Sequence, residues 1–344
     1  MKIRYSVPFT PPQIESAMSI REVSNDNVEQ TAASFEHVAT QKIPPNKLLS
    51  AQELASLNEK SNLKGLIRLA GHLAIMGVSG YLWGAYGLLA LPALVIYGFS
   101  FAAMFSPMHE CIHRTAFANN RLNDAVAWFA GLLSFYNSTF YRRYHKWHHR
   151  FTLVPEKDPE LTDHLPTNLW EYFVALSGMP WWWGKIQGHF SIAAGQVKDY
   201  PFLSSETAQK EVIRSTRLQL LVYAVAIAFS FAVGKPLFLI YWALPLAVGQ
   251  PILRAILLAE HTGCSNDGHS RTNTRTTLTN PLVRFLIWEM SFHCEHHLYA
   301  SIPFHALGNA HDLVGQHFTN NTPGYLSFHR SFVGQLMAGK KATA

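Results

Sequence analysis

Two long stretches without charged side chains interrupt an otherwise polar chain. The first, residues 69–108, holds 40 residues without a single Asp, Glu, Lys or Arg. As one helix, at about 1.5 Å per residue, it would extend about 60 Å, roughly twice the thickness of the hydrocarbon core of a membrane. We therefore predict two spans, at about 66–86 and 89–108, with a turn near residues 83–87 and Pro92 in the first turn of the second helix.

The second stretch, residues 218–253, contains one charge, Lys235, which Pro236 follows directly. This break predicts a second hairpin, with spans at about 217–234 and 236–258. Helices buried inside a soluble protein rarely stay apolar on every face over such lengths. The pattern therefore predicts an all-α integral membrane protein with four transmembrane helices in two hairpins and the polar segments as a helical cap.

The distribution of basic residues predicts how the chain is oriented across the membrane. The chain has 28 Lys and Arg against 22 Asp and Glu, but they form no run or aromatic-interleaved stripe, so we expect no nucleic-acid partner. Positive charge is retained on the cytoplasmic side of membranes, and the two hairpin turns hold only Lys235. We therefore expect both termini and the connecting segment to be cytoplasmic. That segment holds Arg114, Arg121, Arg142, Arg143, Lys146, Arg150, Lys157, Lys185, Lys198, Lys210, Arg214 and Arg217.

The N-terminal segment and the cysteines bear on targeting and on the redox compartment. Residues 1–60 are polar and show no basic start followed by an apolar run, so no cleavable signal peptide is predicted. Cys111, Cys264 and Cys294 are widely spaced and form no Cys-x-x-Cys pair. They predict neither a disulfide framework nor a redox pair, and a reducing compartment fits them.

Eight histidines gather in three clusters, each beside a predicted span or in the connecting segment. Spacings of three and four residues place imidazoles on one helical face, within reach of a shared ion. His261, at the end of the fourth span, is a candidate ninth ligand, although a histidine at a helix C-terminus also gains from the helix dipole. The clusters are HECIH (His109, His113), HKWHH (His145, His148, His149) and HCEHH (His293, His296, His297).

The number and type of these side chains restrict the metal. Eight or nine imidazoles exceed what one ion can bind, whereas two ions with four or five nitrogen ligands each would leave positions open for oxygen or water. Imidazole suits iron, copper, nickel and zinc, but not calcium or magnesium. The residues alone therefore predict a two-metal site on the cytoplasmic side and leave the element open.

The three boxes and their flanking residues resemble the membrane fatty-acid desaturase and hydroxylase superfamily. The resemblance includes residues 144–152, 158–160, 260–263, 275–277 and 302–305, and it covers about residues 64–312, leaving residues 1–60 and a tail at 313–344 outside. It implies a four-span body whose cytoplasmic cap holds two iron ions, O2 as co-substrate and an external electron carrier. The chain has no haem-binding His-Pro-Gly-Gly element, ferredoxin cysteine set or Gly-x-Gly-x-x-Gly fingerprint. We therefore expect a separate donor of ferredoxin or cytochrome b5 type.

The resemblance implies a membrane-bound desaturase that acts on a fatty-acyl chain or a related lipid in the bilayer. A hydroxylase or ketolase of a similar apolar substrate, or a desaturase of a small amino-acid-derived metabolite, shares the same ligand set. The literal His-Glu-x-x-His at residues 109–113 would also fit a membrane zinc protease, but this leaves both His-x-x-His-His boxes unexplained. A metal transporter or a bis-histidine haem protein would place its ligands inside the spans.

Several polar residues near the boxes are candidates for supporting roles. Glu110, Glu260 and Glu295 each adjoin a box histidine or His261 and could orient a ligand by binding its second ring nitrogen. Asn137 could contact a metal-bound water, although a hydrogen bond in a turn fits it as well.

Outside the boxes, three charged residues each have two possible roles. Asp158 and Glu160 lie in a proline-bounded loop where capping or salt bridging competes with a role in the site. Arg254, within the fourth span, could hold a substrate carboxylate or extend to the interface.

Overall fold

The computed structural model describes residues 48–162 and 165–339, apart from the side chain of residue 162. Most of the predicted N-terminal segment, including the region judged for a signal peptide, lies outside the described residues. Its last part forms α2 (Ala51–Leu57), which opens with a capping box: the Glu53 amide donates to the Ser50 hydroxyl at 3.2 Å and the Ser50 amide to the Glu53 carboxylate at 2.8 Å.

The first apolar stretch folds back on itself, as predicted. It forms α3 (Asn62–Tyr86), a 3₁₀ turn η2 (Gly87–Ala90), α4 (Leu91–Ala102) and α5 (Phe105–Ile112). α3 continues through most of the predicted turn and ends at Tyr86. The chain reverses only at Gly87, whose φ of +54° suits a residue without a Cβ. Leu88 and Leu89 in this turn are 77% and 91% exposed, as expected of a segment in contact with lipid.

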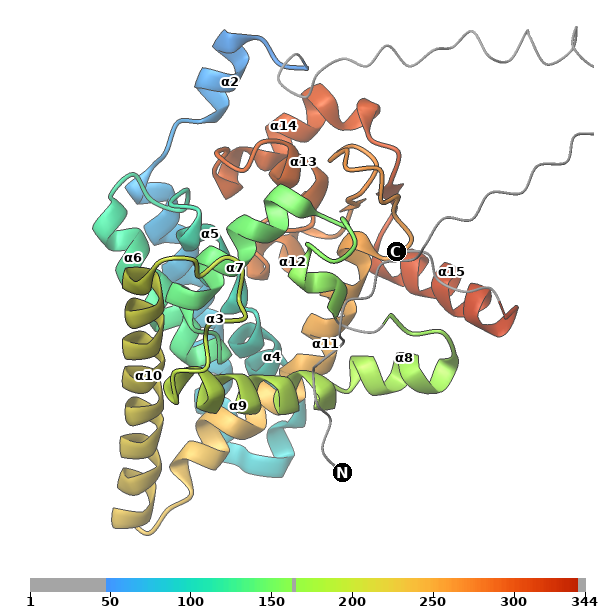
Figure 1. Ribbon diagram of the computed structural model, residues 1–344. Coiled ribbons are helices and arrows are strands. Elements are labelled where there is room, and N and C mark those ends of the chain that lie inside the picture. Colours follow the sequence, from blue (N-terminus) through green and yellow to red (C-terminus); the bar gives the residue numbers. More distant parts are fainter. Residues whose placement is uncertain (1–47, 163–164, 340–344) are drawn as a thin grey trace, which may run out of the picture. The chain divides into compact units, whose positions relative to one another are not determined.

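The second apolar stretch also gives two helices joined by a turn, and Figure 1 shows α11 leaving this turn at a wide angle to α10. α10 (Glu206–Ala232) starts well before the predicted 217, because Ser205 caps it and its first turns are amphipathic. A turn at Gly234 (φ +61°) leads through a π-helical turn, η4 (Leu239–Ala243), into α11 (Leu244–His261). Among the described residues, three helical segments are long and apolar enough to cross a membrane: 62–112, 206–232 and 239–261.

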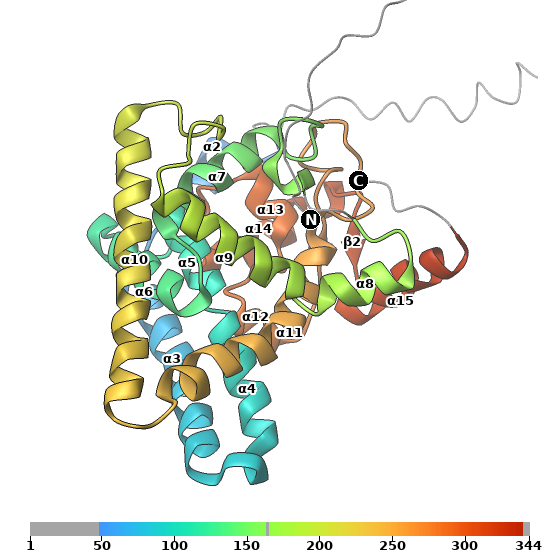
Figure 2. The ribbon, with the colours of Figure 1, turned by 60° about the horizontal axis from the view of Figure 1, so that its bottom comes forward.

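The two hairpins pack through their inner helices. α4 lies against both α3 and α11, as Figure 2 shows. The closest approach joins Gly98 of α4 to Gly249 of α11, where a Cβ on either glycine would overlap the backbone of the other helix. Small residues at such crossings allow membrane helices to pack backbone to backbone.

The remaining elements are short helices that extend from the ends of the hairpins. Two two-residue strands pair in parallel, Thr276 with Asn321 and Thr277 with Thr322. The helical cap predicted from the polar segments thus carries almost no sheet among the described residues. Its helices are α6 (Asn120–Ser134), α7 (Ser138–Phe151), η3 (Pro159–Thr162), α8 (Leu169–Leu176), α9 (Met179–Ala193), α12 (Pro281–Leu286), α13 (His293–Leu298), η5 (Phe304–Ala306), α14 (Leu307–Val314), η6 (Gly315–His317) and α15 (Tyr325–Met337), and its strands are β1 (Thr276–Thr277) and β2 (Asn321–Thr322).

We predict that Gly249→Ala lowers the melting temperature of the protein in detergent, with a loss of about 1–3 kcal/mol, because the added methyl group has no room at the α4–α11 crossing. The matched control is Gly77→Ala in α3, where a Cβ would meet nothing within 4 Å. Equal melting temperatures for the two variants, measured by intrinsic fluorescence, would show that the crossing is not tightly packed.

Candidate metal centre

Four helices carry the nine predicted ligands to one place. His109 lies in α5, and His113 is the C-cap of the same helix. α7 carries the second box, α11 ends at His261, and α13 carries the third box. The helical spacing of three and four residues turns the box histidines of each helix inward, so segments far apart in sequence contribute to a single buried cluster.

Five of the histidines form one group. The Nε2 atoms of His109 and His145 are 2.7 Å apart, those of His145 and His149 are 3.0 Å apart, and those of His149 and His296 are 3.1 Å apart. The His113 ring lies within 5.0 Å of the rings of His145, His149 and His296, centroid to centroid. One nitrogen from each of the five lies within 4.8 Å of every other, which would allow one ion to contact all of them.

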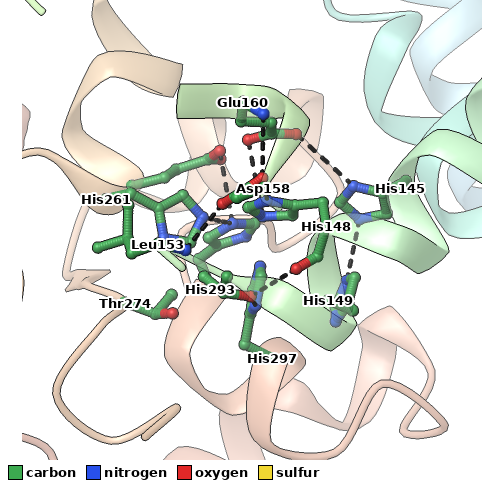
Figure 3. A network of polar contacts seen from close by, with 12 residues as sticks. His145, His148, His149, Leu153, Asp158, Glu160, His261, Thr274, His293 and His297 are labelled. Carbon is green, nitrogen blue, oxygen red and sulfur yellow. Dashed lines mark hydrogen bonds and ion pairs between the residues drawn. The ribbon is translucent and has the colours of Figure 1, made fainter. Parts of the chain in front are cut away.

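A second group lies beside the first, around His148, His261 and His297, whose ligand atoms also lie within 4.8 Å of one another. His293 extends this group, because its Nε2 lies 3.1 Å from the Nε2 of His261. Figure 3 shows these side chains converging from α7, α11 and α13. All nine predicted ligands therefore belong to one of two adjacent groups, of five and of four.

The ring nitrogens at the centre lack ordinary partners. The Nε2 atoms of His113, His148 and His297 are buried without any hydrogen bond, and the hydrogen-bond distances of the other six Nε2 atoms are to one another. Two carboxylates lie farther away, Glu260 at 3.5 Å from His293 Nε2 and Glu160 at 3.6 Å from His148 Nε2. An unsatisfied buried nitrogen costs about 1–3 kcal/mol, and a packed protein core avoids it. Metal ions at the centre of each group would satisfy these lone pairs, so the donor set fits a pair of imidazole-ligated ions.

The opposite ring nitrogens fix which lone pair faces inward. His148 donates from Nδ1 to the Asp158 carboxylate at 2.9 Å, and His261 donates from Nδ1 to the Asn273 carbonyl at 3.0 Å. The Nδ1 of His297 lies 3.2 Å from the Thr152 hydroxyl. A proton held on Nδ1 leaves Nε2 as the basic, metal-binding nitrogen.

Burial sets the protonation state of the rings outside the membrane helices. It lowers the pKa of His113 to about 3, and it lowers the pKa of His145 and His149 well below the usual value, with the neighbouring imidazoles adding to the effect. The same causes act on the pKa of His293, His296 and His297. These rings are therefore neutral at physiological pH, which is the form that binds metal.

His148 behaves differently. Burial alone would lower its pKa, but the carboxylates of Glu160 and Asp158 outweigh burial and raise the pKa above its usual value. Asp158 is itself held by the backbone amides of Leu153 at 2.8 Å and Glu160 at 2.9 Å. Asp158 therefore combines the loop-capping role and the site role that the sequence left as alternatives.

The predicted supporting residues separate into two kinds. Glu110 and Glu260 lie beside predicted ligands, at 3.8 Å from His109 Nδ1 and 3.5 Å from His293 Nε2, but neither forms a hydrogen bond with the second ring nitrogen of that histidine. Glu295 instead accepts from the Thr276 hydroxyl at 2.5 Å and pairs with His311, so it anchors α13 rather than orienting a ligand.

The predicted role of Asn137 at a metal-bound water is corrected by its contacts. Its side-chain oxygen caps α7 by accepting from the Phe140 amide at 2.9 Å. Its amide donates to Ser215 at 3.0 Å and to Gln219 at 3.1 Å. Both ends of the side chain are thus engaged in joining α7 to α10.

Two residues that contact the histidines, Thr152 and Asn273, were not predicted from the sequence. Thr152 lies three residues after the second box, within the flanking stretch that the family resemblance includes, and its small polar side chain gave no signal by itself. Asn273 acts through its backbone carbonyl, which any residue could supply, so no sequence pattern could have identified it.

A cleft of about 630 Å³ opens beside the second group of histidines. His148, His261, Glu160 and Glu260 are among the residues that line it. The cleft continues between α8, α9 and α11, where apolar and aromatic side chains alternate with charged ones. Such a concave site next to a metal centre is where a substrate is expected.

Comparison with known proteins identifies the family of this chain. The chain is 25% identical over 303 residues to the sn-1 oleoyl-lipid 12-desaturase of Picosynechococcus sp., covering 82% of this chain and 84% of that protein. It is 24% identical over 297 residues to the dihydrorhizobitoxine desaturase of Bradyrhizobium elkanii, covering 81% of each. The family model described as fatty acid desaturase matches residues 86–329, and the chain is therefore a member of the fatty acid desaturase family.

Proposed function

We propose that this protein is a membrane-bound, O2-dependent desaturase that introduces a double bond into the saturated chain of a fatty-acyl or related lipid substrate. The observation that carries the proposal is the convergence of nine histidine side chains in two adjacent groups, in a member of a desaturase family. Both relatives are desaturases by name, which favours desaturation over hydroxylation or ketone formation on the same ligand set.

In this proposal the five-histidine group holds one iron and the group of His148, His261, His293 and His297 holds the other. Two bound irons supply the reduction of O2 and the oxidising power needed to remove hydrogen from an unactivated C–H bond. The protein supplies the setting for this chemistry. Asp158, Asn273 and Thr152 hold three of the rings in place, and burial of the cluster excludes water from the reacting atoms.

The electrons must come from a separate carrier, of ferredoxin or cytochrome b5 type, because the sequence carries no motif for an electron-transfer cofactor of its own. We place the active site and both termini on the cytoplasmic side, and count α3, α4 with α5, α10 and α11 as four spans. The basic segment between the hairpins supports this orientation.

The zinc-protease alternative is not favoured by the contacts of its motif. His109 and His113 lie in a five-histidine group, whereas that mechanism needs only two histidines and one further ligand. Glu110, its general base, accepts from the hydroxyl of Thr115 at 3.0 Å.

We predict that His148→Ala and His296→Ala, one from each group, abolish product formation and lower the iron content from about two ions per chain, because each removes a ligand that no neighbour replaces. Expression in a desaturase-deficient bacterium, with mass spectrometry of lipids and polar metabolites, measures the product. Plasma mass spectrometry of the purified protein measures the metal. His269→Ala, in an exposed turn, is the control.

Unchanged product from either cluster variant would refute the di-iron proposal. A single zinc ion per chain in active wild-type protein would favour the protease instead.

We expect Asp158→Asn to weaken iron retention by about 10–100-fold, because the amide no longer stabilises the orientation and basicity of the His148 ring through a charged hydrogen bond. Competition with an iron chelator measures the loss. Asp267→Asn is matched, since Asp267 also caps a loop, accepting from the His269 amide at 3.0 Å and the Thr272 hydroxyl at 2.7 Å rather than from a box histidine. Equal retention in both variants would assign Asp158 to loop capping alone.

Labelling with a membrane-impermeant maleimide tests the orientation. The three native cysteines are buried, so new cysteines at exposed positions report on the side of the membrane. Lys235→Cys, in the turn of the second hairpin, should be labelled on intact cells, and Lys146→Cys only after the membrane is opened. The reverse pattern would overturn the proposed topology.

A further inference from the structure

The stretch at residues 275–277 is one of those that carry the family resemblance, but none of its residues belongs to either histidine group. In the structure it is part of a buried polar segment, residues 273–277, in which every residue is at most 9% exposed. The five residues of this 273–277 segment are Asn273, Thr274, Arg275, Thr276 and Thr277. Burying five polar side chains is costly unless each finds a partner. Their partners therefore indicate what the segment does.

Arg275 binds the end of α11, the helix that carries His261. A helix C-terminus leaves carbonyls without partners inside the helix. The Nη1 of Arg275 donates to the carbonyl of Ala259 at 2.5 Å and to the carbonyl of Thr262 at 2.7 Å, and its backbone amide donates to the carbonyl of Glu260 at 2.8 Å. These three carbonyls lie on both sides of His261 along the chain. The guanidinium also places a positive charge at the negative end of the helix dipole.

The next two residues of the segment bind α13 and the chain that enters it. The hydroxyl of Thr276 donates to the Glu295 carboxylate at 2.5 Å. The backbone amide of Thr277 donates to the carbonyl of Ser291 at 2.8 Å. Ser291 lies two residues before His293, and Glu295 lies two residues after it. The segment therefore holds α13 on either side of the first histidine of the third box.

The first two residues of the segment reach α7 and the ring of His261. The Asn273 carbonyl accepts from His261 Nδ1 at 3.0 Å, and the Asn273 side-chain amide donates at 3.3 Å to the carbonyl of Thr152, the C-cap of α7. The hydroxyl of Thr274 donates to the Asn273 side-chain oxygen at 2.8 Å, which fixes the orientation of that amide. The segment thus bonds to each of the three helices that supply the four-histidine group.

The small parallel sheet fixes the segment itself. The backbone amide of Thr276 donates to the carbonyl of Asn320 at 3.0 Å, and that of Leu278 donates to the carbonyl of Thr322 at 2.8 Å. The Asn320 side-chain amide donates to the carbonyl of Thr272, just before the segment, at 2.6 Å. The segment is therefore held from its far side while it contacts α7, α11 and α13. None of the hydrogen bonds described for it reaches α5, which carries two ligands of the five-histidine group.

We propose that the 273–277 segment positions the four-histidine group, and that Arg275 is the positioning residue for His261. Arg275 acts through the carbonyls at the end of α11 and not by contact with a metal. The inference rests on the proposed function, because it concerns how one of the two metal-binding groups is held. α11 carries one of the nine predicted ligands, His261, which belongs to the four-histidine group. Loss of the guanidinium should therefore loosen one metal and leave the other in place.

The test follows the release of iron from the iron-loaded, full-length protein to a chromogenic ferrous chelator. The protein is reduced and kept without O2, so that no turnover occurs and the time course reports each bound ion. Arg275→Gln removes the charge and the contact with both carbonyls, whereas Arg275→Lys keeps the charge. Asp158→Asn acts on His148 and identifies the phase that belongs to the four-histidine group.

Arg217→Gln is the matched control for the loss of an arginine that caps a helix. The Nε of Arg217 donates at 2.8 Å to the carbonyl of Ala193, the last residue of α9. α9 carries none of the nine predicted ligands. This variant therefore loses the same kind of contact without touching a helix of the metal centre.

We expect Arg275→Gln to speed the release of one iron by about tenfold, in the same phase that Asp158→Asn speeds, and to leave the other phase unchanged. Arg275→Lys should fall between Arg275→Gln and the wild type, and Arg217→Gln should release both ions at the wild-type rates. If Arg275→Gln does not fold, Arg275→Lys carries the test, and release from it at the wild-type rates would overturn the inference.

Two results with Arg275→Gln would also overturn the inference: wild-type rates for both ions, or equal acceleration of both, which is what a general loss of stability would give. Either result, in a protein that holds two irons, would leave the proposed desaturase intact. A wild-type protein that holds no second iron would instead refute the di-iron proposal, and the inference with it.

Discussion

The structure depends on one constraint: nine imidazole rings are buried together with their Nε2 atoms facing one another. Neutral rings whose Nε2 atoms face one another at 2.7–3.1 Å contribute little stability by themselves. The fold must therefore hold them against a cost that bound cations can offset. Contacts around the cluster hold its helices and rings in place. Asn137 caps α7, Glu295 anchors α13, and fixed acceptors hold the Nδ1 atoms of His148 and His261.

The long apolar helices position the histidine cluster at their ends. α5 continues the first hairpin into the site and α11 ends at His261, so two ligand-bearing elements are extensions of the apolar helices. The contact of Gly98 with Gly249 brings α4 and α11 close together. A shift at this crossing would displace His261 relative to α5. The precision of the metal centre thus depends partly on helix packing well away from it.

Much of this arrangement could be predicted from the sequence, because it follows from local patterns. Hydropathy located both hairpins, and the three- and four-residue spacing of the histidines identified the side chains that the structure brings together in two groups. The start of α10 was missed because an amphipathic extension at Glu206 carries charges that hydropathy counts against a span. Asn273 was missed because its role lies in the backbone. The division of the ligands into groups of five and four depends on how α5, α7, α11 and α13 meet, which no local pattern specifies.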